Sequence, residues 1–263
     1  MGLVIGSGVV LSEFITPEFS QAIICFDNVL GVDNVSATSA SADNPITNIA
    51  NASTSFLWEA GSTSSQTITI NSDGRDIDYV GLARHNLNQP GLTIEVKFNG
   101  VTVLQPQAVP NRDALLLILA VATPTTIQIV ISGAQVAAKV AVVYAGKSLI
   151  LERGLYVGHT PITYGRDRTA INGISENGQY LGEIVVRETN STQVSLKNLT
   201  PLWYRENLDP FFSASPRAPC FWSWRSIDYP SEVGYCWTEG NPKPVNQLSN
   251  GMMSIDWNFK GIV

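Results

Sequence analysis

The stretch that decides the fold is QTITINSDGRDIDYVGLARHNL, residues 66–87. Apolar and polar side chains alternate over residues 66–71 and again over residues 77–83, which is the period of a β-strand. Between them Ser72-Asp73-Gly74-Arg75 is a polar turn, with glycine where a positive φ costs little. The stretch predicts two strands joined as a hairpin, and nothing catalytic lies on it.

Strand signals continue beyond this stretch. Residues 91–98 alternate up to Asn99-Gly100, the strongest hairpin-turn signal in the chain, and a strand returns over residues 101–104. Residues 115–121, 126–131 and 136–145 are further runs of strand length bounded by Pro or Gly. No helical period accompanies them, so a β-sandwich is the economical prediction.

A polar loop precedes the deciding stretch. Residues 34–60 are rich in Ser, Thr, Asn and Ala, with Pro45 near the middle and Phe56 and Trp58 near the end. A large ring that follows such a loop usually fixes the loop to a hydrophobic core. We therefore expect Trp58 to be a core anchor.

Composition bounds the class of protein. The chain has 263 residues, of which 44% are hydrophobic and 14% charged, and its formal net charge is −6. This length fits one large or two moderate β domains, and the low charge suggests a surface partly covered by partners. The acidic balance argues against nucleic acid as a partner. No apolar run approaches the ~20 residues of a membrane span, and no secretory signal is evident, so we expect a soluble protein made in a cytoplasm.

The three cysteines do not form a recognisable motif. Cys25, Cys220 and Cys236 are an odd number, without CxxC spacing or neighbouring histidines. Neither a zinc site nor a disulfide framework is indicated. Buried free thiols are favoured over a Cys220–Cys236 bridge, and no metal or cofactor is expected.

The chain divides into three parts. Residues 1–33 form an N-terminal arm or added strand, residues 34–148 a first β-sandwich, and residues 149–263 a second β-rich domain with many aromatic residues. In the last part residues 183–189 and 193–199 read as a strand pair around Asn190-Ser191. Thr200-Pro201 fits the start of a short helix that Pro210 would end.

The first domain resembles a known family. The order of the polar loop, Asn44-Pro45, Trp58, QTITI, IDYVGLARHNL, LLLILAVATPTTIQIVI and VAVVYAG is similar to a discoidin-like jelly roll (coagulation factor 5/8 C type, galactose-binding-like) over residues 34–146. The resemblance implies that Trp58 is the ring that packs into the barrel. It also raises the alternative function of a carbohydrate-binding module, whose loops 35–56 and 84–91 would contact host surface saccharide.

The second domain carries another resemblance. YVGHTPITYGRDR, NGQYLGEIVVRE and GMMSIDWNFKG are similar to tail-tip proteins of bacteriophages with long non-contractile tails, in the distal-tail or baseplate group. The resemblance implies a structural virion protein at the tail tip, made in the host cytoplasm. It would form a homo-oligomeric ring of three- or six-fold symmetry that connects the tail tube to hub or receptor-binding fibre proteins.

Polar residues on these segments are the candidate contacts with a ligand or partner. The residues with this role are Arg84, His85 and Asn86 at the exit of the deciding stretch, and Arg166, Asp167, Arg168 and Arg187 in the second domain. The arginines can bind a partner's carboxylate through two parallel hydrogen bonds.

An enzyme is the least favoured class. No partner residue of a catalytic motif lies at a recognisable spacing from either histidine, His85 or His159. Two of the three residues Glu176, Glu183 and Glu188 could supply the pair of carboxylates that glycoside hydrolysis needs. They lie among arginines, however, so ion pairs at the surface or at an interface are the favoured interpretation. No catalytic residue is therefore predicted. The aromatic residues between positions 203 and 257 fit either a sugar-stacking platform or a core with a subunit interface, and rings on both faces of the strand at 221–224 favour the latter.

Overall fold

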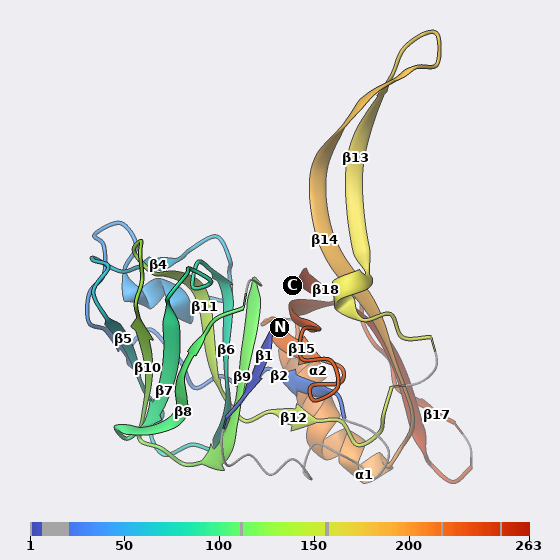
Figure 1. Cartoon of the computed structure of the whole chain (residues 1–263). Coiled ribbons are helices and arrows are strands. Elements are labelled where there is room, and N and C mark those ends of the chain that lie inside the picture. The colour runs from blue at the N-terminus through green and yellow to red at the C-terminus, as the bar shows by residue number, and fades with distance from the viewer. Residues whose placement is uncertain (1, 7–20, 111–112, 156–157, 217, 248) are drawn as a thin grey trace.

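The computed structural model of the chain (Figure 1) describes residues 2–6, 21–110, 113–155, 158–216, 218–247 and 249–263. Residues 7–20 of the predicted N-terminal arm lie outside this part. The strands of the first half are β1 Leu3–Ile5, β2 Ile23–Cys25, β3 Val35–Ala37, β4 Trp58–Glu59, β5 Gln66–Asn71, β6 Ile77–His85, β7 Thr93–Phe98, β8 Val101–Ala108, β9 Ala114–Ala122, β10 Thr126–Ser132 and β11 Lys139–Gly146. Those of the second half are β12 Leu149–Ile150, β13 Arg166–Ile174, β14 Tyr180–Leu199, β15 Cys220–Ser223, β16 Val233–Glu239, β17 Val245–Asn246 and β18 Met253–Ile262.

The first domain is a sandwich of two five-stranded sheets. An outer sheet has the order β3-β5-β10-β7-β8, and a middle sheet has the order β1-β9-β6-β11-β4. Strands β5, β7 and β10 alternate buried and partly exposed residues, so the outer sheet has one face toward the core and one toward solvent. The core between the sheets includes Trp58, Ile68, Leu82, Leu117 and Val143. The prediction of an all-β chain that begins with a β-sandwich is confirmed.

The middle sheet is covered on both faces. Residues 77–83 of β6 and 140–146 of β11 are buried without alternation. One face packs on the outer sheet. The other face, which carries Tyr79 and Tyr144, packs against Phe221 and Tyr235 of the second domain. The molecule is therefore a stack of three sheets rather than two separate sandwiches.

The hairpin predicted from residues 66–87 is wrong. The turn forms, with Asp73 and Gly74 at φ 49° and 71°, but β5 pairs with β10 and β3 while β6 pairs with β9 and β11. The turn therefore carries the chain from the outer sheet to the middle sheet. Asn99-Gly100 does join a hairpin, β7 to β8, with both residues at positive φ.

The second domain is built on an eight-stranded sheet with the order β12-β2-β15-β16-β18-β14-β13, in which β17 also pairs with β18. We call it the hairpin sheet. The N-terminal part of the chain adds a strand to each domain, because β1 pairs in parallel with β9 whereas β2 lies between β12 and β15. The second domain is therefore not contiguous in sequence.

A helical segment covers the face of the hairpin sheet opposite to the one that packs on the middle sheet. It comprises α1 Pro201–Trp203, a π-helical turn over Tyr204–Leu208 and α2 Asp209–Ala214 (Figure 1). Tyr204, Leu208 and Phe211 pack there against Trp222 and Phe259. The predicted helix start at Thr200-Pro201 is confirmed. The predicted end at Pro210 is wrong, since Pro210 directly follows the π-helical turn and helical backbone continues through it to Ala214.

The strand pair predicted around Asn190-Ser191 is also wrong. Strand β14 runs through this point without a turn, because Asn190 lies opposite Arg166 of β13 on one side and Gly261 of β18 on the other. Backbone pairing on both sides holds the chain extended. The Asn190 amide donates to the Ile162 carbonyl at 2.8 Å, in a short helical turn, Ile162–Tyr164.

The cysteines are buried and free, as expected. Cys220 lies opposite Cys236 on neighbouring strands, and Cys25 packs between the domains. Within the residues described, no helix is long and apolar enough to cross a membrane.

Candidate functional site

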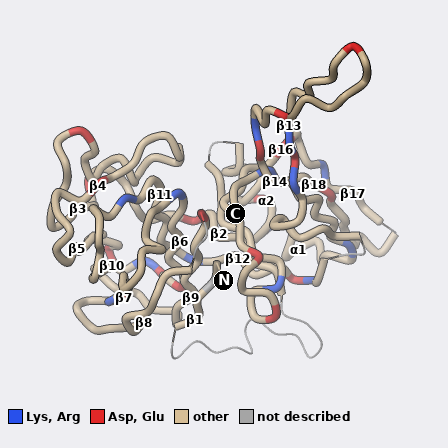
Figure 2. The backbone as a smooth tube through the Cα atoms, turned by 45° about the horizontal axis from the view of Figure 1, so that its top comes forward, with Lys and Arg blue, Asp and Glu red and all other residues tan. Residues whose placement is uncertain are grey.

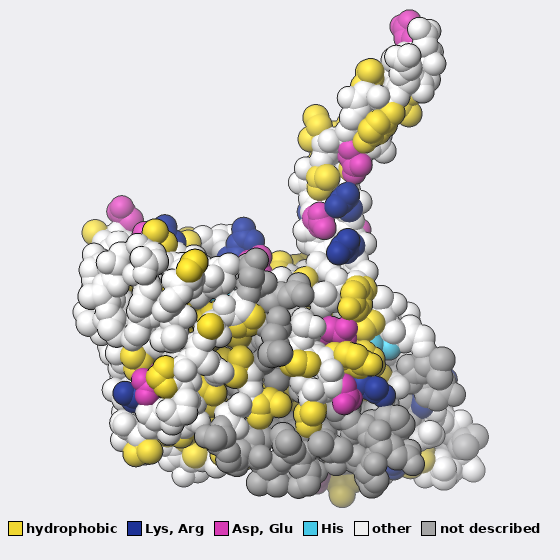
Figure 3. Space-filling model, viewed as in Figure 1, with side chains coloured by type: hydrophobic (Ala, Val, Ile, Leu, Met, Phe, Trp, Pro, Cys, Tyr) yellow, Lys and Arg dark blue, Asp and Glu magenta, His cyan; other side chains and the backbone are white. Residues whose placement is uncertain are grey.

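The most unusual surface is a hairpin that projects from the body of the molecule (Figure 1). It consists of β13 and residues 180–189 of β14, and we call it the projecting hairpin. Its side chains are largely exposed: Ile171 is 63%, Tyr180 65% and Ile184 70% accessible. The other large apolar residues exposed on it are Ile174, Leu181, Val185 and Val186. Figure 3 shows these apolar side chains along its length.

The apolar side chains lie on both faces of the projecting hairpin. Ile171 lies opposite Ile184, so the two share one face. Along β13 the side chains alternate, so Ile174, which lies opposite Tyr180, is on the other face. A strand that is apolar on both faces is normally covered on both.

Both backbone edges of the projecting hairpin are open. Strand β13 is the last strand of its sheet, and β18 begins to pair with β14 only at Asn190. Among the described residues no strand pairs with the outer edge of residues 180–189. An isolated two-stranded hairpin is marginally stable in water, and free edges are templates for pairing with another chain.

Charged residues gather where the projecting hairpin leaves the body (Figure 2). The Arg168 guanidinium lies 3.3 Å from the Glu188 carboxylate and 3.9 Å from that of Glu183. The Lys260 ammonium lies 2.9 Å from the Asp167 carboxylate, and its hydrogen bond to that carboxylate lowers the pKa of Asp167. Three of the predicted contacts in this segment, Asp167, Arg168 and Arg187, thus lie on two neighbouring strands among ion pairs made within the chain.

Two of the glutamates considered for glycoside hydrolysis take part in these ion pairs. Glu183 and Glu188 share the Arg168 guanidinium on an exposed strand pair. This arrangement is the ion pairing that the sequence favours.

The three predicted contacts in the first domain lie together at the end of β6. Arg84, at φ 53°, places its guanidinium 3.0 Å from the Asp113 carboxylate. Asn86 donates to the Ala137 carbonyl at 2.9 Å and accepts from the Lys139 N–H at 2.7 Å. These bonds hold the end of β6 against its neighbours, and a contact with a ligand stays a prediction.

His85 is held as a neutral imidazole. Its Nδ1 accepts a hydrogen bond from the Leu87 N–H at 3.3 Å. Burial lowers the pKa of His85 to about 4, against the opposing effect of Asp113. The neutral His85 ring thus helps to fix the end of β6, and its contact with a ligand stays a prediction.

The ring of Trp58 is fully buried between the two sheets of the first domain, and its Nε1 donates to the Ser39 carbonyl at 3.0 Å. Phe56, two residues earlier, is 55% exposed. The polar loop therefore buries one ring and presents another at the surface.

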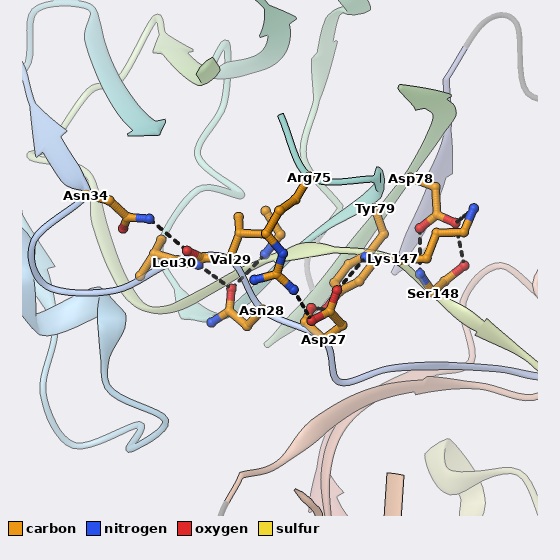
Figure 4. A network of polar contacts seen from close by, with 11 residues as sticks. Asp27, Asn28, Val29, Leu30, Asn34, Arg75, Asp78, Tyr79, Lys147 and Ser148 are labelled. Carbon is orange, nitrogen blue, oxygen red and sulfur yellow. Dashed lines mark hydrogen bonds and ion pairs between the residues drawn. The ribbon is translucent and has the colours of Figure 1, made fainter. Parts of the chain in front are cut away.

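A polar latch joins the two domains (Figure 4). The Asp78 carboxylate, almost fully buried, accepts from the Ser148 N–H at 2.7 Å and pairs with the Lys147 ammonium at 3.2 Å. The Arg75 guanidinium reaches the Asp27 carboxylate at 2.6 Å. Asp27 follows β2 and Ser148 precedes β12, so the latch fixes both described connections between the domains. Desolvation raises the pKa of Asp78.

Sequence reasoning missed the apolar character of the projecting hairpin. The signal was present in GEIVVRE, residues 182–188, and in Ile171 and Ile174. A run such as Ile184-Val185-Val186 looks like any buried strand, and only the sheet order shows that nothing in the chain covers it.

We compared the chain with known proteins. Searched against protein families and against curated proteins, the sequence has no match. Among solved structures it is similar to chitosan-binding module 1 of a chitosanase/glucanase from Paenibacillus sp. IK-5, with 13% identity, 46% of this chain and 99% of that chain covered, and a TM-score of 0.40.

Two further solved structures are similar to the chain. One is a fucose-binding module from Streptococcus pneumoniae, with 11% identity, 46% of this chain and 98% of that chain covered, and a TM-score of 0.39. The other is the family 32 carbohydrate-binding module of C. perfringens NanJ in complex with galactose, with 14% identity, 45% and 97% coverage, and a TM-score of 0.36. These neighbours are carbohydrate-binding modules, and they do not bear on a phage tail.

Proposed function

We propose that this chain is a structural subunit that assembles with further copies of itself through the projecting hairpin. One observation carries the proposal: the projecting hairpin exposes large apolar side chains on both faces and leaves both edges unpaired. Burying such side chains stabilises an assembly by roughly 1.5–3 kcal/mol for each residue that becomes fully covered.

A second copy of the chain is the partner that this surface fits. Arg168 and Lys260 at the base of the projecting hairpin already pair with carboxylates of the chain, so the surface left for a partner along its length is mainly apolar. Interfaces of this composition are typical of permanent homo-oligomers. Because the projecting hairpin extends away from the body (Figure 1), it would contact a different surface on the next copy, and such head-to-tail contacts form a ring when the rotation from copy to copy closes.

The place of the assembly is the second part of the proposal. The sequence resemblance supports a ring of three- or six-fold symmetry at the tip of a long non-contractile phage tail, between the tail tube and hub or fibre proteins. In this reading the protein is a virion component and not an enzyme.

Light scattering on the full chain tests the assembly. We expect a mass that is a multiple of the monomer at micromolar concentration, and a ring in single-particle images. The Ile171→Thr/Ile184→Thr variant, which keeps strand-forming residues, should shift the mass toward the monomer. Val101→Thr on the first domain is the matched control, since Val101 is also 68% exposed. A monomeric parent chain would exclude the proposal.

The phage assignment has its own test. Mass spectrometry of purified virions from a phage that encodes this chain should find the protein at a few copies per particle. Its absence from virions would remove the assignment and leave self-assembly standing.

A second candidate function is saccharide binding by the loops of the first domain. The observation that favours it is Phe56, whose exposed ring borders a loop rich in serine, threonine and asparagine. Aromatic rings of this kind stack on apolar sugar faces while polar neighbours bind hydroxyl groups. If these loops are the saccharide site, Phe56→Ala abolishes binding to a glycan array, and an unchanged array signal would exclude these loops as the site.

A further inference from the structure

A polar crevice of about 420 Å³ lies at the base of the projecting hairpin. Its floor is one face of β14, β16 and β18, and its wall is the end of the turn at Tyr164 with the first residue of β13, Arg166. The volume falls within the range of ordinary small-ligand sites. Of the contacts predicted from the sequence, Arg166 lines this crevice.

The floor is a row of three polar side chains on adjacent strands. Asn258 of β18 lies opposite Gln193 of β14 on one side and opposite Glu239 of β16 on the other. Side chains opposite each other on neighbouring strands lie about 5 Å apart. The structure gives no hydrogen bond from another described residue to the side-chain amide of Gln193 or Asn258. The row therefore presents two amides and a carboxylate, which together donate and accept.

Two aromatic rings border this row. Tyr164 lines the crevice and is 66% exposed. Trp237 lies two residues before Glu239 on the same face of β16 and is 36% exposed. Exposed rings beside amides offer an apolar face for stacking and polar groups for orientation.

The charges around the crevice are largely paired. Lys260 pairs with Asp167 at 2.9 Å and with Glu239 at 3.6 Å, and Arg166 supplies a second positive charge. Arg187 also acts on Lys260 and Asp167, so three cations stand against two carboxylates, but Lys260 is already shared between its two carboxylates and offers little to an anion such as phosphate. A neutral ligand rich in hydroxyl groups suits the row of amides and the two rings.

We propose that this crevice is a binding site for a neutral saccharide, with Asn258, Gln193 and Glu239 binding ring hydroxyls and with Tyr164 or Trp237 stacking on the apolar face of the sugar. The site is independent of self-assembly and distinct from the loops of the first domain. It lies on the face of β16 that also carries Tyr235, whose hydroxyl donates to the Ala52 carbonyl of the first domain at 2.7 Å.

Saturation-transfer NMR on the full chain tests the site. The probes are glucose, galactose, mannose, fucose and N-acetylglucosamine, with sialic acid as a charged comparison. At least one neutral sugar should show transfer from the protein. Asn258→Ala and Tyr164→Ala should each weaken that binding by about tenfold. Both side chains are exposed, so the melting temperature of each variant should match that of the parent.

Matched controls keep the outcome decisive. Gln128→Ala removes a strand amide on β10, outside the crevice, and should leave binding unchanged. Phe56→Ala should also leave it unchanged. Absence of transfer to every neutral sugar, binding of sialic acid alone, or loss of binding in Phe56→Ala with retention in Asn258→Ala would each overturn the proposal. The last outcome would place the saccharide on the first domain.

Discussion

Gly81 of the middle sheet lies directly beneath the ring of Phe221 in the hairpin sheet. A methyl group on the Gly81 Cα would stand 2.5 Å from the ring atom Cε2, closer than any real contact. The Phe221 ring also packs against Tyr144 and Tyr235, with centroid distances of 5.8 and 5.0 Å. The close approach of the two domains therefore depends on the missing side chain at position 81.

Gly81→Ala should destabilise the protein by about 1–3 kcal/mol, because the added methyl group overpacks a rigid interface. Urea denaturation with tryptophan fluorescence measures the loss. Combining it with Phe221→Leu, which gives the methyl group room, should recover part of the stability. Gly154→Ala is the control, since a methyl group there meets nothing within 4 Å. Equal stability of Gly81→Ala and the parent would show that the interface can shift freely.

Trp58→Ala should cost about 3–5 kcal/mol, because it empties a fully buried site between the two sheets of the first domain. Removal of the ring also leaves the Ser39 carbonyl without its donor. Thermal unfolding followed by circular dichroism measures the effect. Phe56→Ala, on the same loop but exposed, should keep the parent melting temperature, and a similar loss in both variants would contradict the anchoring role of Trp58.

His85 should make the protein less stable in acid. Its pKa is about 4 in the folded chain and about 6.5 when unfolded, so the folded state binds the proton less readily. The contribution of His85 is complete above pH 6.5 and is lost as the pH falls through about 4, amounting at most to about 3 kcal/mol.

His85→Asn isolates this effect, because the Asn oxygen can accept from the Leu87 N–H and does not titrate. The difference in unfolding free energy between parent and variant should change between pH 7 and pH 4 in favour of the variant. A difference that stays constant over this range would show that His85 does not titrate with folding.

The latch predicts a coupled pair of substitutions. Lys147→Met leaves the buried Asp78 carboxylate without its cation and should cost about 1–3 kcal/mol at pH 7. Adding Asp78→Asn removes the unpaired charge and should restore part of the loss. Because the folded pKa of Asp78 is raised, its charged form lowers stability at neutral pH, and this cost disappears as the pH falls through the raised pKa. Additive effects in the double-mutant cycle would rule out a coupled latch.

The local sequence predicted strands better than it predicted their partners. Alternation in QTITI and the Asn99-Gly100 turn are local signals, and both β5 and the β7–β8 hairpin are present. The pairing of β5 with β10, about 60 residues away, depends on which apolar faces meet in the core. Alternation along one strand shows that the strand has an apolar face, but it does not show which strand lies beside it. For this reason the prediction of a turn at Asp73-Gly74 is confirmed, whereas the prediction that this turn joins two paired strands is wrong.

The candidate site was less accessible to sequence reasoning. The sequence predicted contacts at four charged residues of the second domain, Arg166, Asp167, Arg168 and Arg187. These residues do lie at the base of the projecting hairpin. The crevice beside them was missed, because Asn258, Gln193 and Glu239 come from three separate strands and meet only through the sheet register. No spacing along the chain marks such a row.

The position of β2 has a consequence for synthesis on the ribosome. This strand is made early, yet its neighbours in the hairpin sheet are β12 and β15, and β15 begins nearly 200 residues later, at Cys220. The intervening first domain can close before β15 exists, and Ile24 of β2, which packs only in the core of the second domain, then has no partner. The two domains thus mature in a nested order, and a fragment that begins after residue 148 would lack the strand that joins β12 to the rest of its sheet.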